Sequence, residues 1–158
     1  MRLTAKVLVV LFITLTACSG VDSVTKKRWN NFENTISIVD MTSSDFSLMD
    51  AGSEIQGAIE EQLQFTGYTL TGNNARYKLK YKVMEFNEGN RAVRIATMGM
   101  ADSGKGTLRV KVALYDGDNM VGAWEVDAWV SGGITGGSNN NLFESAATEI
   151  ADHLRGDF

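Results

Sequence analysis

The chain has 158 residues, of which 44% are hydrophobic and 22% are charged. These values fit one folded domain and exclude wholesale disorder. The formal net charge of −4 argues against a nucleic-acid-binding module, which is normally basic on one face. A single cysteine and a single histidine exclude a disulfide framework, a cysteine-based zinc site and a histidine-rich metal cluster. We therefore expect no metal, no cofactor and no nucleic-acid partner.

The first 18 residues have the pattern of an export signal. Arg2 and Lys6 precede an apolar run over residues 7–17. A helix of that length spans about 16 Å, which is short of the roughly 30 Å core of a bilayer. The run ends in Leu15-Thr-Ala-Cys18, which resembles the bacterial lipobox. The resemblance implies that residues 1–17 are a removable signal peptide and that Cys18 becomes the lipidated first residue. The alternative is an ordinary secretory signal in which Cys18 falls at this place by chance.

The residue after the cysteine bears on the location. It is Ser19 and not aspartate, and by resemblance to enterobacterial sorting this favours the outer membrane over the inner one. We expect residues 18–31 to form the lipidated cysteine and a tether, and residues 32–158 to form a single domain facing the periplasm. The basic residues 26–28 and Trp29 would then lie either free in a solvated linker or on anionic headgroups.

The expected elements of the domain follow the order β-α-β-β-β-β-α. Strands with β-branched or alternating apolar residues are predicted at residues 34–40, 76–86, 91–98, 107–115 and 120–131. Helices with apolar residues three and four positions apart are predicted at residues 50–65 and 141–154. The fold class is therefore α+β, with a mostly antiparallel sheet of about five strands and both helices packed on one face.

The strand at residues 107–115 also carries a family resemblance. Residues 104–117, GKGTLRVKVALYDG, resemble the signature strand of a bacterial lipoprotein family called domain of unknown function 4410. The resemblance covers roughly residues 40–154 and extends to the lipobox, the glycine-rich stretch and the C-terminal helix. It implies an α+β envelope domain related to lipoprotein domains that serve secretion or cell-wall machines. It supplies no catalytic residues, because the family has no assigned activity.

Three partial motifs are too incomplete to indicate chemistry. Residues 99–106, GMADSGKG, nearly match a nucleotide-binding P-loop, but Gly106 replaces the hydroxyl residue and a strand follows instead of a helix. The Asp116-x-Asp118 pattern lacks the later oxygen ligand and the glycine of a calcium loop. His153 lies near no serine motif, so we interpret it as a surface or helix-end histidine. We expect no nucleotide and no catalysis.

Outward-facing charges alternate along the predicted strands. Lys78, Lys80 and Lys82 share one face, and residues 109 and 111 of the next strand are also basic. If the strands are neighbours, Glu125 and Asp127 pair across with those two as modest stabilisers. The alternatives are an edge strand guarded by lysines, or a partner-binding face for an acidic protein or anionic polymer, centred on Lys78, Lys80 and Lys82.

A glycine-rich stretch connects the last strand to the last helix. Gly132, Gly133, Gly136 and Gly137 lie in it, and their amides could hold an anion at the start of the helix. Because residues 132–141 contain no lysine or arginine, we interpret the stretch as a mobile loop, with partner binding as the hypothesis to test.

Two functions remain on these grounds. The first is a non-catalytic binding or assembly module that is lipid-anchored at the outer membrane and contacts an envelope protein. The alternative is a subunit of a homomeric export or pore-like assembly, in which glycine-rich segments rearrange on oligomerisation.

Overall fold

The structure is a computed structural model that describes residues 19–28, 33–44, 46–72, 75–90, 92, 104–131 and 139–156. These residues form one sheet and two helices. The elements in chain order are β1 (Ser19–Lys27), β2 (Thr35–Asp40), α1 (Phe46–Phe65), β3 (Thr69–Leu70), β4 (Tyr77–Asn87), β5 (Gly106–Asp116), β6 (Asn119–Val130) and α3 (Asn140–Arg155).

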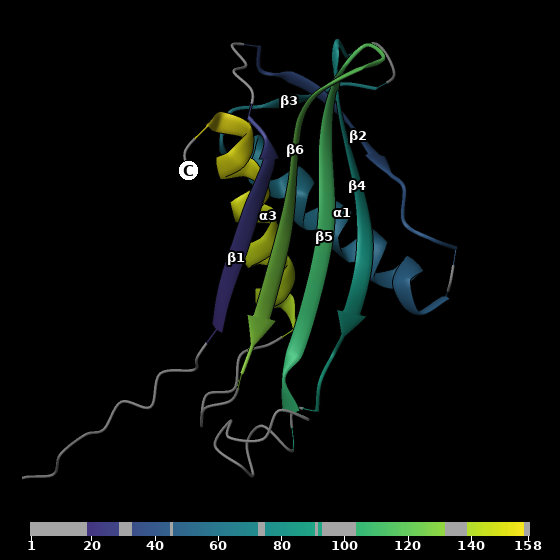
Figure 1. Ribbon diagram of the computed structural model, residues 1–158, viewed down its shortest axis with the longest axis vertical. Coiled ribbons are helices and arrows are strands. Elements are labelled where there is room, and N and C mark those ends of the chain that lie inside the picture. Colours follow the sequence, from purple (N-terminus) through teal and green to yellow (C-terminus); the bar gives the residue numbers. More distant parts are fainter. Residues whose placement is uncertain are drawn as a thin grey trace, which may run out of the picture.

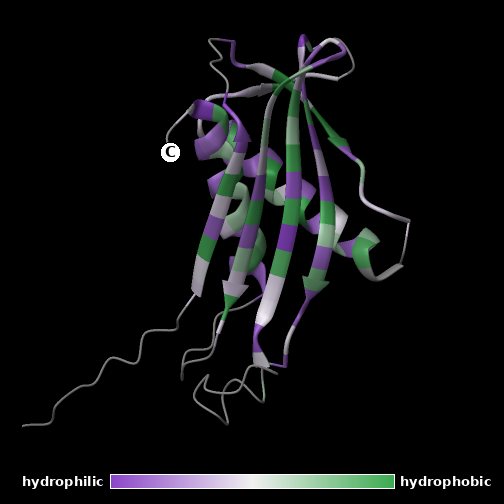
Figure 2. Ribbon diagram, viewed as in Figure 1, coloured by the Kyte–Doolittle hydropathy of each residue, from purple (hydrophilic) through white to green (hydrophobic). Residues whose placement is uncertain are grey.

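The two helices lie together behind one face of the sheet, as the sequence predicts (Figure 1). The sheet has six strands in the spatial order β1-β6-β5-β4-β2-β3. Apolar and polar side chains alternate along the long strands, so one face of the sheet is apolar and the other polar (Figure 2). The α+β prediction is confirmed.

The sheet is mixed, which refines the prediction of a mostly antiparallel sheet. β1–β6, β6–β5 and β5–β4 are antiparallel, whereas β2 runs parallel to both β3 and β4. The reason is the connection through α1. A helix carries the chain back along the sheet, so the strand that follows it enters in the same direction as the strand before it.

The expected tether over residues 18–31 is wrong for its larger part. Ser19–Lys27 is strand β1, which pairs antiparallel with β6. Its inward side chains Ser23 and Thr25 are polar, and for this reason the segment lacks the alternation of a buried strand. The basic cluster that the sequence placed in this tether begins at Lys26, at the far end of β1 from Ser19. A strand of nine residues extends roughly 27 Å.

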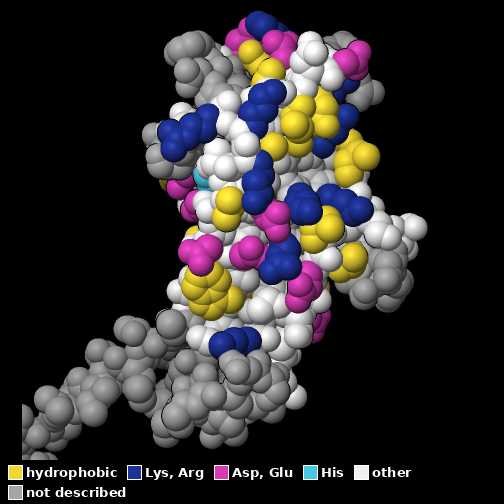
Figure 3. Space-filling model, in the orientation of Figure 1, with side chains coloured by type: hydrophobic (Ala, Val, Ile, Leu, Met, Phe, Trp, Pro, Cys, Tyr) yellow, Lys and Arg dark blue, Asp and Glu magenta, His cyan; other side chains and the backbone are white. Residues whose placement is uncertain are grey.

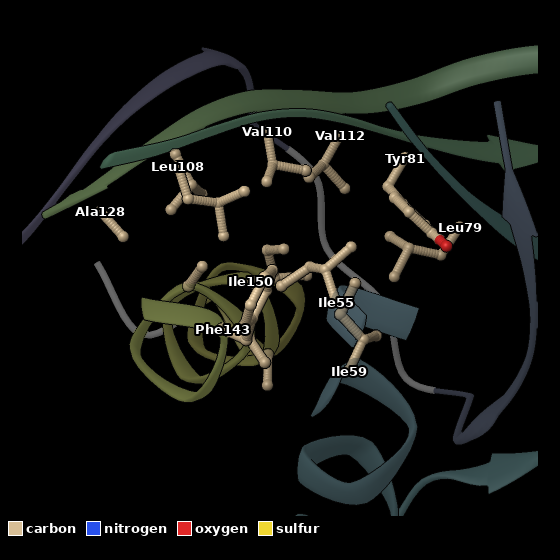
Figure 4. Packing of buried hydrophobic residues seen from close by; sticks show 14 of the residues in the cluster. Ile55, Ile59, Leu79, Tyr81, Leu108, Val110, Val112, Ala128, Phe143 and Ile150 are labelled. Atoms are coloured by element: carbon tan, nitrogen blue, oxygen red, sulfur yellow. The ribbon is translucent and has the colours of Figure 1, made fainter. Parts of the chain in front are cut away.

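The core lies between the helices and the inner face of the sheet. Ile55 and Ile59 of α1 and Ile150 of α3 meet Leu79 of β4 and Val110 of β5, and all five are fully buried (Figure 4). Burial of each large aliphatic side chain contributes about 1.5–3 kcal/mol relative to leaving it exposed. The core thereby covers one face of the sheet, and no described helix covers the other face (Figure 1).

The expected strand at residues 91–98 lies outside the described residues, apart from Ala92. The short strand β3, which the sequence does not predict, joins the sheet beside β2. After β1, the order of elements is the expected β-α-β-β-β-β-α, with β3 among the four consecutive strands.

Candidate binding surface

The outer face of the sheet carries its charges in rows that cross four strands (Figure 3). The rows follow from the register, which sets outward residues of β4, β5, β6 and β1 directly opposite one another. From the β5–β6 turn downward in Figure 1, three successive rows are Lys80, Ala113, Ala123 and Lys27; Lys82, Lys111, Glu125 and Val24; Glu85, Arg109, Asp127 and Asp22. Basic residues thus dominate the upper rows and acidic residues the lowest.

The upper rows enclose a hollow of about 460 Å³ that we call the basic hollow. Ala113 and Ala123 lie opposite each other in its lining, and their small side chains leave the space open. The lining includes four lysines and one acid, namely Lys26, Lys80, Lys82, Lys111 and Glu125. A volume of this size is within the usual range for small-molecule sites and also admits side chains of a partner protein.

Arg109 forms ion pairs with three acidic residues of the outer face. Its guanidinium lies 2.6 Å from Asp127, 3.6 Å from Glu85 and 3.7 Å from Glu125. The neighbouring carboxylates, above all Asp127, raise the pKa of Arg109 above its ordinary value. Glu125 lies directly opposite Lys111 in the register, yet its ion pair is with Arg109. Among the described residues, Glu125 therefore lines the basic hollow without forming an ion pair to any of its lysines.

None of the four lysines of the basic hollow forms an ion pair with a described residue. The ammonium of Lys80 lies 4.2 Å from the centroid of the Tyr115 ring. Lys82 and Lys111 also face each other across β4 and β5. Like charges in this position destabilise a strand pair, so this arrangement does not serve the stability of the sheet.

The predicted site residues divide into three groups. Lys80 and Lys82 line the basic hollow, whereas Lys78 lies on the same face opposite Tyr115 but outside the hollow. The prediction that Glu125 and Asp127 lie across from Arg109 and Lys111 is confirmed, and the register sets Asp127 opposite Arg109 and Glu125 opposite Lys111. Cys18 and the glycines Gly132, Gly133, Gly136 and Gly137 lie outside the described residues.

Lys26 is the member of the basic hollow that sequence reasoning missed. The sequence predicts that Lys26 lies in a tether, because residues 19–27 show no regular alternation of apolar and polar side chains. An irregularity between Thr25 and Lys27 interrupts the pairing of β1 with β6, and Lys26 lies at this point and lines the hollow. The β-branched residues Val21, Val24 and Thr25 are the signal that favours a strand here.

Of the two sequence interpretations of His153, the helix-end position is confirmed and the surface position is wrong. It lies near the end of α3 with 3% of its surface exposed, and its ring stacks on Trp124 at a centroid distance of 5.7 Å. Its Nε2 lies 2.6 Å from the Ser23 hydroxyl and 3.3 Å from Glu149. Burial lowers the pKa of His153 below its usual 6.5, while Glu149 opposes that shift.

The cluster of Ser23, Glu149 and His153 is a structural contact and not a catalytic triad. The Ser23 hydroxyl donates to Glu149 at 2.5 Å, so its oxygen accepts from Nε2 of His153. A nucleophilic serine needs the reverse arrangement, in which the imidazole accepts the hydroxyl proton and the carboxylate orients the other ring nitrogen. Here Nδ1 faces the Thr25 hydroxyl at 3.4 Å instead. The contact joins β1 to α3.

Two further properties concern only the described part of the chain. Its His, Cys, Asp and Glu side chains form no group of three or more that could hold a metal ion. None of its helices is long and apolar enough to cross a membrane.

The fold defines a small α+β domain whose helices cover only one side of the sheet, with a charged face on the other side (Figure 1 and Figure 3). The chain belongs to the family described as domain of unknown function DUF4410, whose model matches residues 24–133. The family expected from the signature strand is thereby confirmed. A search of curated proteins finds no match.

Solved structures share the fold. The PelC dodecamer from Paraburkholderia phytofirmans aligns with a TM-score of 0.55 at 15% identity, covering 87% of this chain and 98% of that one. A single-residue variant of that dodecamer gives a TM-score of 0.55 at 16% identity, with 86% and 98% covered. The protein XCC0632 from Xanthomonas campestris, of the DUF330 family, gives a TM-score of 0.50 at 12% identity, with 81% and 85% covered.

Proposed function

We propose that this chain is a lipid-anchored envelope lipoprotein that works without catalysis, as a self-assembling binding module at the outer membrane. The observation that carries the proposal is the shared fold with PelC, which was solved as a dodecamer. Nearly all of that chain is covered by the alignment, so the likeness extends over a whole subunit and not over a fragment. It supports the homo-oligomeric form of assembly over a monomeric adaptor.

The anchoring part of the proposal rests on the lipobox and on the position of β1. Cys18 directly precedes Ser19, the first residue of a strand that is paired along its length with β6. A lipid on Cys18 would therefore hold the sheet itself at the bilayer, with no tether between them. In that arrangement the basic hollow would lie toward the other end of β1, at a distance from the membrane.

The non-catalytic part of the proposal rests on the chemistry of the polar clusters. The Ser23 proton points to Glu149 and not to His153, and Arg109 is surrounded by carboxylates on an open face. Neither arrangement generates a nucleophile or a positioned general base. The first arrangement joins β1 to α3, and the second fixes charged side chains of β4, β5 and β6. Both therefore stabilise the structure around a binding surface.

Replacing Cys18 with alanine is expected to abolish incorporation of a labelled fatty acid and to move the protein from the membrane fraction to the soluble periplasmic fraction. The reason is that two or three acyl chains hold a protein on a bilayer, and no other anchor is proposed. A matched Ser19→Ala variant should remain labelled and membrane-bound. Retention of the label in the Cys18→Ala protein would contradict lipidation at this residue.

A further inference from the structure

The helix layer is strongly acidic, whereas the upper rows of the outer sheet face are basic. α1 and α3 contain no lysine and only one arginine, Arg155, which pairs with Asp152 at 2.9 Å. Their acidic residues are Asp50, Glu54, Glu60, Glu61, Glu144, Glu149 and Asp152. The net negative charge of the chain is thus concentrated on the side of the molecule opposite the basic hollow.

Part of this acidity lines a groove between the two helices. Two adjoining hollows of about 320 and 440 Å³ share Ser53, Glu54, Asn140 and Phe143 in their lining. We call them together the acidic groove. Its carboxylates come from Asp50, Glu54, Glu61, Glu88 and Glu144, and none of the lysines and arginines that the structure describes lines it. Gly57 and Ala58 are small residues that line the groove. A Cβ atom at Gly57 would meet no atom within 4 Å, so this part of the groove is open to solvent.

The two charged surfaces lie on opposite sides of the molecule. The acidic groove belongs to the helices behind the sheet in Figure 1, whereas the basic hollow is on the face turned to the viewer in Figure 3. A two-fold dimer that joins either surface to itself would oppose lysine to lysine or carboxylate to carboxylate. A head-to-tail contact instead sets lysines against carboxylates at every interface, and such heterologous contacts repeat into closed rings or open filaments.

We propose that the basic hollow of one copy docks onto the acidic groove of the next copy. This inference rests on the proposed homo-oligomeric function and names the surfaces that would build it. Lys80, Lys82 and Lys111 would face Glu54, Glu61 and Glu144 of the neighbouring copy. Ala113 and Ala123 would lie against the small residues of the acidic groove, which lets the two backbones approach closely. Complementary charge of this kind sets register and partner choice, and its strength falls as salt is added.

The role of Arg109 follows from this arrangement. Arg109 pairs with Glu85, Glu125 and Asp127, and none of these three acids forms an ion pair with Lys82 or Lys111. The lysines thereby stay available to carboxylates from another copy. Arg109 acts in this account as a positioning residue outside the contact itself.

Charge reversal tests the contact most sharply, using the full chain extracted from membranes in detergent and sized by sedimentation. One variant carries Lys80→Glu and Lys82→Glu, and a second carries Glu54→Lys and Glu61→Lys. Each alone is expected to dissociate, with its dissociation constant raised by roughly tenfold or more, because like charges then meet at every interface. An equimolar mixture of the two is expected to reassemble with alternating copies, since the reversed hollow of one variant fits the reversed groove of the other. The chain that carries all four substitutions should also reassemble.

The controls separate this contact from general charge effects and from misfolding. Lys78→Glu changes a lysine of the same strand outside the basic hollow, so it should disturb assembly far less than Lys82→Glu. Reassembly of the mixture itself shows that both variants are folded. As an independent measurement, a mixture of Ala113→Cys and Gly57→Cys chains should form intermolecular disulfides under mild oxidation, whereas either chain alone should form far fewer.

The possible outcomes lead to different conclusions. A wild-type chain that sediments as a monomer would overturn the proposed homo-oligomer and this contact with it. A wild-type oligomer that survives both reversals would overturn the contact and leave the oligomer standing. Two variants that dissociate and fail to reassemble when mixed, with no disulfide between residues 113 and 57, would show that these two surfaces do not meet.

Discussion

Replacing Gly89 with alanine is expected to destabilise the domain by roughly 2–5 kcal/mol. Gly89 has a φ of +65°, a backbone conformation that residues with a side chain rarely adopt. A Cβ atom at this position would lie 2.5 Å from the backbone carbonyl oxygen of Gly104 and from the carbonyl carbon of Lys105. Because these neighbours are backbone atoms at the entry to β5, the clash cannot be relieved by turning a side chain. The measurement is the free energy of unfolding in urea, followed by tryptophan fluorescence.

Gly117 provides a matched control for the Gly89 prediction. It also has a positive φ, +59°, but a Cβ atom there would meet nothing within 4 Å. Gly117→Ala should therefore show only the backbone cost, about 1–2 kcal/mol. Equal losses of stability in the two variants would mean that the close approach of the 89 and 104–105 segments is not a feature of the folded protein.

The free energy of unfolding is expected to decrease as the pH falls below 6.5, with a contribution from His153 of up to about 1.4 kcal/mol per pH unit. Burial lowers the pKa of His153 in the folded protein below 6.5, so the unfolded chain takes up the proton first. Stability is therefore full above 6.5 and is lost as the pH falls from 6.5 to the lowered pKa. Glu149 and Asp152 of α3 limit the loss, because their charges favour the protonated ring.

The His153 contribution is measured against a His153→Gln variant. Glutamine cannot take up a proton, so the difference in unfolding free energy between the two proteins isolates the histidine from the carboxylates that also titrate. The wild type should lose more stability than the variant between about pH 7.5 and about pH 5. Parallel curves would contradict the burial of a neutral His153 between β1, β6 and α3.

The sequence predicted the elements whose side chains follow a simple period. β4, β5 and β6 alternate apolar and charged residues, and α1 and α3 space their apolar residues at three and four. Each of these five elements was expected within a few residues of its observed bounds. The sequence also indicated that Glu125 and Asp127 lie across from Arg109 and Lys111, whereas the exact opposition depends on a register shift between Leu114 and Tyr115 that no sequence pattern indicates.

β1 could not be predicted in this way, for a physical reason. Ser23 and Thr25 point toward the helices but meet polar groups there, because Glu149 and His153 come from α3. Burial of a polar side chain is tolerated when it is hydrogen-bonded. Glu149, the partner of Ser23, lies 126 residues away in the sequence, so β1 has no apolar alternation and only its β-branched residues favour a strand.

The binding surface was predictable only in part for a similar reason. Lys80 and Lys82 follow from alternation along one strand. Two further features depend on the order of strands in the sheet and on the distances between long side chains. Lys26 lines the basic hollow and Lys78 does not, and Glu125 pairs with Arg109. The acidic groove likewise requires α1 and α3 to lie side by side, which their separate sequences do not specify.

The proposed function requires that this protein assembles with copies of itself. The most direct test is the mass of the wild-type chain, extracted from membranes in mild detergent and measured by sedimentation or native mass spectrometry at low salt. We predict a single species that contains several copies of the chain and that dissociates as salt is raised. A strictly monomeric species at every salt concentration would contradict the account.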